Sequence, residues 1–261
     1  MQEKISISSN KEHLKIIQMT DTHLFADKRQ KLQGYCTYQN LSETIDYLLV
    51  SKEVPHFVLL TGDISQDEFF ESYQLTRMQL ERLNLPIYWI HGNHDDEAKV
   101  RAIFDLSPCL KQLKHLMTPF WDFIAINTCR RGTDDGYLEE NDLILFWQKV
   151  GIAKKNNKNI VVVMHHHPHP ISTPLVDACM LQKASNFLMQ IKKHQEIKLI
   201  ICGHVHGDYQ ISYDGLMIEA CPATSFQWKK GASTLLTENK RGFKCFKFYA
   251  HTDYQISTVF I

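Results

Sequence analysis

Histidine is the most unusual feature of this sequence. The chain has 14 histidines among 261 residues, and the imidazole side chain is the most common metal ligand in proteins. The histidines are also clustered, so that several of them could bind the same ion. The two clusters are His165, His166, His167 and His169, and, further along the chain, His204 and His206.

Metal-binding side chains also follow predicted strands in a repeated way. The strands are apolar, often β-branched runs at 14–19, 56–60, 87–90, 160–164 and 198–202. The motifs that follow them are D-x-H at 21–23, G-D at 62–63, G-N-H-D at 92–95, H-H-H-P at 165–168 and G-H-x-H at 203–206. The carboxyl ends of strands in an open α/β sheet converge on one crevice. We therefore expect five distant residues to meet there: Asp21, Asp63, Asn93, His165 and His204.

The spacing inside two of these motifs favours shared ions. Residues i and i+2 of an extended chain point the same way, so Asp21 and His23 could bind one ion. His204 and His206 could bind one ion together, or one each of two neighbouring ions. The glycines beside the motifs allow the backbone to turn sharply and to approach a ligand closely.

Each motif has an ordinary explanation when it is taken alone. D-x-H and G-D are common in surface turns, and the histidine run could be a solvated loop. The G-H-x-H motif beside Cys202 could belong to a structural zinc site, although no second Cys/His pair lies at zinc-finger spacing. The occurrence of all five motifs in order, each at a predicted strand end, favours a single metal site.

The remaining pattern predicts the elements that position these motifs. Helices are expected over 41–49, with Asn40 and Glu43 as a capping pair, from a cap at Asp67 to about 83, over 143–150, and over 180–191. Further strands are expected at 121–128, 209–213, 216–220, 233–237, 243–249 and 256–260. This order predicts a layered α/β protein whose later strands are mostly antiparallel. We expect one domain over 1–261, with a β-rich part from about 208.

Composition excludes several classes of protein. Lys and Arg total 29, as do Asp and Glu, so the chain lacks the basic excess of a protein that coats nucleic acid. No apolar run is long enough to span a membrane, and residues 1–14 lack the apolar core of an export signal. The seven cysteines form no C-x-x-C pair. We therefore expect reduced thiols and a cytoplasmic protein.

The order of the motifs resembles that of the calcineurin-like metallophosphoesterases. Within that family, Thr20-Asp21-Thr22-His23-Leu24-Phe25-Ala26 and Val163-Met164-His165-His166-His167-Pro168 are similar to stretches of the bacterial class III cyclic-AMP phosphodiesterases. The stretch at 224–228 is also similar in character. The resemblance runs from about Leu14 to the final strand. It implies a four-layer α/β/β/α sandwich of two mixed β-sheets flanked by helices, with two divalent metal ions.

The resemblance also implies the ligands of the two ions. Asp63 would bridge both ions, and His165 is the family's position within the histidine run, with His166 or His167 as the alternative. The implied ligands of the first ion are Asp21, His23 and His206. The implied ligands of the second ion are Asn93, His165 and His204.

Such a site suits the hydrolysis of a phosphodiester. Two divalent ions ~3.5–4 Å apart can clamp a phosphoryl group and ionise a shared water. Two carboxylates and a hydroxide would leave a net charge of about +1, which suits a phosphodiester monoanion. Mixed nitrogen and oxygen ligands favour Fe, Mn or Zn over Mg or Ca.

His94 is the candidate for acid–base chemistry, together with Asp63 at the centre of the site. It is not needed as a ligand, so it can donate a hydrogen bond to the phosphate or protonate the leaving oxygen. Asp95 either orients His94 or caps a helix that begins at Glu97. The residues expected to contact the substrate are His23, Asn93 and His94.

We therefore predict a metal-dependent phosphodiesterase that converts 3′,5′-cyclic AMP to 5′-AMP. The alternatives are another small phosphodiester or pyrophosphate, such as a 2′,3′-cyclic nucleotide or a nucleotide-diphosphate alcohol, and a non-catalytic interaction scaffold. The expected partner is a small molecule rather than nucleic acid or a membrane, and a homodimer is possible. By resemblance alone, Thr173, Asp177 and 224–228 are candidates for the rim of the pocket.

Overall fold

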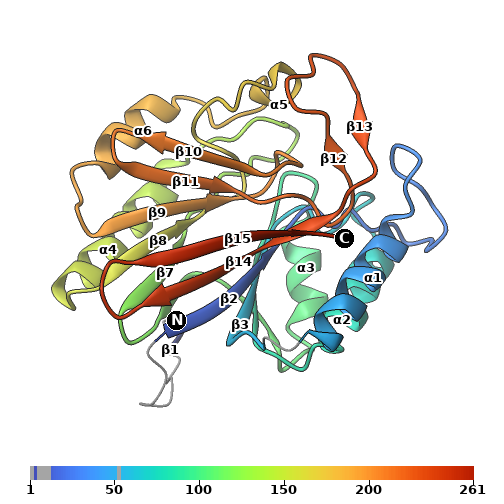
Figure 1. Cartoon of the computed structure of the whole chain (residues 1–261), viewed down its shortest axis with the longest axis horizontal. Coiled ribbons are helices and arrows are strands. Elements are labelled where there is room, and N and C mark those ends of the chain that lie inside the picture. Colours follow the sequence, from blue (N-terminus) through green and yellow to red (C-terminus); the bar gives the residue numbers. More distant parts are fainter. Residues whose placement is uncertain (1–2, 5–12, 52–53) are drawn as a thin grey trace.

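Two mixed β-sheets pack face to face, and helices cover both outer faces (Figure 1). The computed structural model describes residues 3–4, 13–51 and 54–261. The polar start of the chain, where no export signal is expected, lies mostly outside these residues. The layers are those of the α/β/β/α sandwich that the resemblance implies.

The first sheet has six strands in the order β15-β14-β2-β3-β4-β5. Strands β2 to β5 are parallel, and β14 and β15 extend the sheet in antiparallel fashion. Three helices, α1 to α3, connect the parallel strands. The bounds are β2 His13–Met19, α1 Thr37–Val50, β3 Phe57–Thr61, α2 Phe70–Glu81, β4 Ile87–Ile90, α3 Glu97–Phe104, β5 Leu110–Gln112, β14 Gly242–Tyr249 and β15 Tyr254–Phe260.

The second sheet has seven strands in the order β1-β6-β7-β8-β9-β11-β10. Its central strands, β7, β8, β9 and β11, are parallel. A small two-stranded hairpin, β12–β13, lies beside both sheets (Figure 1). The bounds are β1 Glu3–Lys4, β6 His115–Met117, β7 Trp121–Ala125, α4 Glu140–Lys155, β8 Asn159–Val163, α5 Pro174–Asp177, α6 Ala184–Ile191, β9 Ile197–Cys202, β10 Tyr209–Tyr213, β11 Leu216–Ala220, β12 Gln227–Trp228 and β13 Thr237–Glu238.

Strand β3 shows why the central strands read as continuous apolar runs. Phe57 and Leu59 face the core between the two sheets, whereas Val58 and Leu60 face the helices of the first sheet. All four side chains are fully buried. A strand that is covered on both faces needs apolar residues at every position rather than at alternate ones. The structure confirms the predicted strands at 56–60 and 160–164, and burial on both faces explains their continuous apolar sequence.

Both predicted helix caps are wrong. Helix α1 begins at Thr37, so Asn40 lies inside the helix, where its amide donates to the backbone oxygen of Ser225 at 2.5 Å. Helix α2 begins at Phe70. The Asp67 carboxylate accepts hydrogen bonds from the backbone of Ala26 and Phe69 instead. In both cases a residue of a type that often caps helices instead binds the backbone of a nearby loop.

Several predicted elements differ from the structure at their ends. Strand β7 ends at Ala125 rather than at 128, and α6 begins at Ala184 rather than at 180. The strand predicted at 233–237 is wrong, because β13 covers only Thr237–Glu238 and the apolar residues before it form an exposed loop.

No helix among the described residues is both long and apolar enough to cross a membrane. All seven cysteines are free thiols.

Candidate metal and phosphoester site

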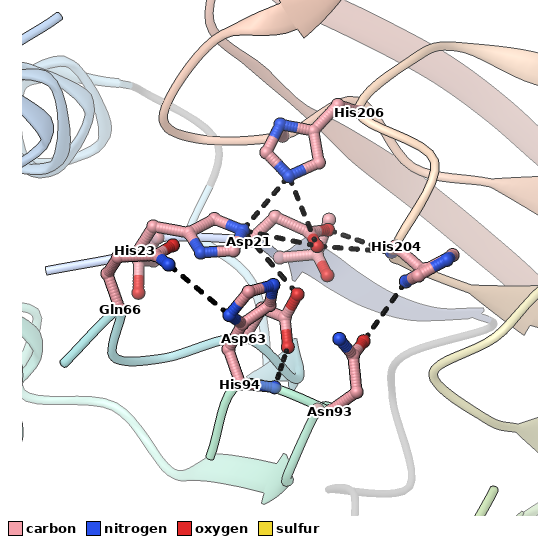
Figure 2. A network of polar contacts seen from close by, with 12 residues as sticks. Asp21, His23, Asp63, Gln66, Asn93, His94, His204 and His206 are labelled. Carbon is pink, nitrogen blue, oxygen red and sulfur yellow. Dashed lines mark hydrogen bonds and ion pairs between the residues drawn. The ribbon is translucent and has the colours of Figure 1, made fainter. Parts of the chain in front are cut away.

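Five loops meet at the carboxyl ends of the parallel strands, and Figure 2 labels residues of the loops after β2, β3, β4 and β9. They follow β2, β3, β4, β8 and β9, and each carries one of the predicted motifs. The first and the last of these loops along the chain are joined directly, since the backbone N–H of His204 donates to the Asp21 carboxylate at 3.0 Å. The structure thus brings together all seven side chains predicted to bind metal: Asp21, His23, Asp63, Asn93, His165, His204 and His206.

Four of these side chains form a first group. Nε2 of His23 lies 3.0 Å from Nε2 of His206 and 3.5 Å from Oδ2 of Asp63. Nε2 of His206 lies 3.6 Å from Oδ1 of Asp21. Figure 2 shows the rings of His23 and His206 turned toward the Asp21 carboxylate. Four donor atoms therefore converge on one point.

A second group lies on the other side of Asp63. Oδ1 of Asn93 is 3.1 Å from Nε2 of His165 and 3.2 Å from Nδ1 of His204. Nε2 of His165 is also 3.3 Å from Oδ1 of Asp63. Since Oδ2 of Asp63 faces the first group, the two oxygens of this carboxylate face different groups. This is the geometry required of a bridging ligand.

The backbone at the site is strained. The φ angles are positive at Asp21 (53°), His23 (45°), Asp63 (51°), His204 (68°) and His206 (44°). Residues other than glycine rarely adopt this left-handed region, and such strain concentrates at functional sites. The strain turns each side chain away from its strand and toward the common centre.

Two glycines let the loops approach one another. A Cβ atom on Gly62 would lie 2.4 Å from Nδ1 of His165, and one on Gly92 would lie 2.1 Å from Oδ1 of Asp63. Neither position has room for any side chain. The glycines are therefore needed to bring the two carboxyl-end loops together around Asp63.

The hydrogen bonds of two histidines fit a metal site. Nδ1 of His165 donates to the backbone oxygen of Thr61 at 2.8 Å, and Nδ1 of His206 donates to that of Phe226 at 2.9 Å. Each bond fixes the ring and turns Nε2 toward the cluster. Histidines that bind metal almost always have such a second partner.

The electrostatics of the cluster also fit cations. Burial holds the pKa of His23 and of His204 well below the usual value and lowers that of His206 to about 4, so these rings are neutral and have lone pairs to share. Burial raises the pKa of Asp21 to about 7. Burial would lower the pKa of His165, but the nearby Asp63 carboxylate outweighs it and raises this pKa to about 9. Metal ions bind the deprotonated forms of such groups, so cation binding here would release protons from Asp21 and His165.

The structure separates the members of the histidine run. His165 faces Asp63 and Asn93. His166 is close to His165 and His204, but its Nδ1 contacts the Thr128 hydroxyl at 2.9 Å and its Nε2 the backbone oxygen of Asp134 at 3.1 Å. His167 faces Asp177, with Nε2 3.4 Å from Oδ1. This arrangement favours His165 as the ligand.

His94 lies at the edge of the cluster and has a partner that the sequence did not reveal. Its backbone N–H donates to Oδ1 of Asp63 at 3.0 Å, and its ring nitrogen Nδ1 is 3.3 Å from Nε2 of Gln66. The Gln66 amide is therefore the hydrogen-bond partner of Nδ1 in this ring. The only signal in the sequence is that Gln66 follows Asp63 by three residues.

Both roles considered for Asp95 are wrong. Helix α3 is capped by Asp96, whose side chain accepts from the backbone of Lys99. The Asp95 carboxylate accepts backbone hydrogen bonds from Gly92 at 2.8 Å, Ile64 at 3.0 Å and Ser65 at 3.0 Å. It therefore ties the loop after β4 to the loop after β3. Burial raises its pKa to about 6.

A cavity of about 310 Å³ opens beside the cluster. It is lined on one side by His94 and five of the seven predicted ligands, and on the other by mostly apolar side chains, among them Phe226 and Trp228 of the predicted rim stretch. The other rim candidates, Thr173 and Asp177, do not line it. Their hydrogen bonds support the loop around α5 instead.

Curated relatives match the chain over most of its length. A probable cyclic nucleotide phosphodiesterase of Coxiella burnetii is 32% identical over 88% of this chain and 91% of its own length. A 3′,5′-cyclic-nucleotide phosphodiesterase of Nostoc is 28% identical over 96% and 91%. The 3′,5′-cyclic adenosine monophosphate phosphodiesterase CpdA of Escherichia coli is 25% identical over 84% and 79%.

Solved structures share the fold at low sequence identity. A dimetal phosphatase from Danio rerio has a TM-score of 0.63 at 11% identity and covers 94% of this chain and 98% of its own. The Plasmodium inner-membrane-complex anchor GAP50 has a TM-score of 0.65 at 16% identity, with coverages of 96% and 85%. The family model for the calcineurin-like phosphoesterases matches residues 14–208, a range that contains all five motifs. This chain therefore belongs to the calcineurin-like phosphoesterase family.

Proposed function

We propose that this phosphodiester hydrolase converts 3′,5′-cyclic AMP to 5′-AMP with the help of two divalent ions. The observation that carries the proposal is the pair of ligand groups that share Asp63 at one end of a cavity with apolar walls. The charged end suits a phosphodiester, and the apolar end suits a nucleoside. The names of the relatives from Coxiella, Nostoc and Escherichia coli support the same substrate class.

The proposed ligands follow the two groups. Asp21, His23 and His206 would hold one ion, Asn93, His165 and His204 the other, and Asp63 both. The mixed nitrogen and oxygen donors suit Fe, Mn or Zn. When bound, two such ions lower the pKa of a water molecule and neutralise the phosphate charge.

His94 is proposed as the general acid. When water attacks phosphorus, the bond from phosphorus to the ribose O3′ breaks and that oxygen needs a proton. The acid is the imidazolium form of His94, which gives its Nε2 proton to O3′ and keeps the proton on Nδ1. The Gln66 amide lies 3.3 Å from Nδ1 and accepts that Nδ1–H through its oxygen once the amide turns. His94 lines the cavity and is only partly buried, so it can reach the substrate, beside His23 and Asn93. We further expect the chain to act as one domain in the cytoplasm.

A substrate panel tests the proposal. The Mn²⁺-loaded protein should hydrolyse 3′,5′-cyclic AMP with a kcat/KM well above that for 2′,3′-cyclic AMP, a nucleotide-diphosphate alcohol or bis-p-nitrophenyl phosphate. A preference for one of the other natural diesters would replace the proposed substrate and leave the chemistry in place. Absence of hydrolysis of every ester, with both ions bound, would favour the scaffold alternative.

A further inference from the structure

The cavity beside the cluster has an apolar half that the proposed chemistry does not use. Three structures form it: the turn at 32–35, helix α5 and the β12–β13 hairpin. None of them carries a predicted metal ligand. The apolar side chains that line this half are Leu32, Leu175, Val176, Phe226, Trp228 and Leu235.

The turn at 32–35 is fixed in place. Leu32 and Tyr35 exchange two backbone hydrogen bonds of 3.0 and 2.9 Å, with positive φ angles at Gln33 (51°) and Gly34 (88°) between them. These angles are those of a type I′ turn. The Tyr35 ring stacks on Phe226 with a centroid distance of 5.4 Å, so this wall is anchored against the site.

Helix α5 and the hairpin are joined to each other. The backbone N–H of Leu175 donates to the oxygen of Ala232 at 3.1 Å, and that of Gly231 donates to the Thr173 hydroxyl at 3.0 Å. The Asp177 carboxylate in turn accepts from the backbone of Thr173 at 3.0 Å. The apolar half is therefore formed before any ligand binds.

Leu235, in the hairpin loop, lines the cavity although 62% of its surface is exposed. Covering such a side chain with an apolar group is favourable. Outside the ligand cluster and His94, the polar side chains that line the cavity are Gln33, Gln66, Asp134 and Cys179. Gln33 and Asp134 are both exposed, so any hydrogen bond to them competes with water, and the Gln66 amide is already paired with the His94 ring.

We propose that this apolar half is the nucleobase subsite and that it holds the base by contact with its faces. This inference rests on the proposed function, since the phosphate must sit at the ligand cluster for the base to reach Leu235. A hydrophobic pocket discriminates by size and rejects groups of similar shape only weakly. The subsite therefore favours purines over pyrimidines but does not separate adenine from guanine strongly.

Two neighbouring leucines supply a matched pair of variants. Leu236 is also exposed, at 48%, but it does not line the cavity. Leu235→Ala should raise KM for 3′,5′-cyclic AMP roughly threefold to tenfold at unchanged kcat, because it removes binding that the ground and transition states share. It should leave the hydrolysis of methyl p-nitrophenyl phosphate, which has no nucleobase, unchanged, and Leu236→Ala should change neither substrate. Equal KM values for both variants would overturn the subsite.

The choice of base gives a second readout on the unaltered protein. The kcat/KM values for cyclic AMP and cyclic GMP should agree within about tenfold, and both should exceed that for cyclic CMP. A preference for cyclic AMP over cyclic GMP above about 10²-fold would require hydrogen-bond readout and would overturn the proposal. A protein that hydrolyses simple diesters but no cyclic nucleotide would instead show that the proposed function, on which the subsite depends, is wrong.

Discussion

The two ends of the active-site cavity are built in opposite ways. At the ligand end, side chains such as Asp21 and His165 are almost fully buried and lie on short turns at strand ends. At the apolar end, Leu235 and Gln33 are exposed and lie on a hairpin and a turn. Substitutions at the ligand end should therefore disturb the reaction itself, whereas substitutions at the apolar end should alter substrate binding and leave the reaction intact. Substitutions at the two ends should therefore have different kinetic signatures.

The largest effect is expected at Asp63, because its two carboxylate oxygens face different ligand groups. Asp63→Asn removes the negative charge between the two cations and should lower kcat on the order of 10³-fold or more. Metal analysis should show the loss of at least one ion per chain. Asp27→Asn, on an exposed loop, is the control. An Asp63→Asn protein with two ions and near-native kcat would refute the ligand assignment.

The loss of activity on removing His94 should be larger for a substrate with a poorer leaving group. Ribose O3′ is a poor leaving group and needs a proton, whereas p-nitrophenolate does not. His94→Ala should slow the hydrolysis of cyclic AMP by about 10²–10⁴-fold and spare much of the activity on bis-p-nitrophenyl phosphate. Equal losses on both substrates with both ions bound would mean that His94 only stabilises phosphate charge. Loss of one ion would make it a ligand.

Gly92 tests the close packing of the ligand end. Gly92→Ala would place a Cβ 2.1 Å from Oδ1 of Asp63 and should lower kcat by about 10²-fold through displacement of that carboxylate. Gly151→Ala in α4 is the matched control, since its Cβ would meet nothing within 4 Å and should stabilise the helix by about 0.5–1 kcal/mol. Kinetics and thermal unfolding of both variants measure the contrast. Native activity in Gly92→Ala would show that the loop can relax.

The smallest effect is expected at Gln66, which acts through His94. Gln66→Leu removes one hydrogen bond, worth about 1 kcal/mol, and should lower kcat for cyclic AMP about fivefold. In a His94→Ala background the same substitution should have no further effect on kcat. An independent, additive loss in the double variant would show that Gln66 does not work through the His94 ring.

The ligand end was predictable from sequence for a physical reason. Each of its loops follows a strand that is covered on both faces. The apolar run of such a strand therefore marks where the strand ends, and the polar residue just beyond must lie at the edge of the sheet. The sequence could not show that Asp63 turns its two oxygens toward different groups. It assigned His165 but left His166 and His167 as alternatives, because a one-residue difference on a loop depends on contacts such as the one between His166 and Thr128.

The apolar end and the supporting contacts were not predictable. The run at 233–237 has the composition of a strand, but Leu235 and Leu236 lie on an exposed loop. The spacing of apolar residues does not distinguish such a loop from a buried strand at the edge of a sheet. Asp95 has the right type for a helix cap, yet it binds backbone groups of Ile64 and Ser65. These partners are about 30 residues away, and no local pattern records them.

Metal removal tests the central claim that the seven side chains form one two-ion centre. The protein is stripped with a chelator and titrated with Mn²⁺, while bound metal, melting temperature and cyclic AMP hydrolysis are followed together. We predict that the stripped protein is inactive and melts at a lower temperature, because the ions tie together loops from Asp21 to His206. Activity and melting temperature should both recover as two ions bind per chain. Full activity in excess chelator, with no metal found by elemental analysis, would contradict the account.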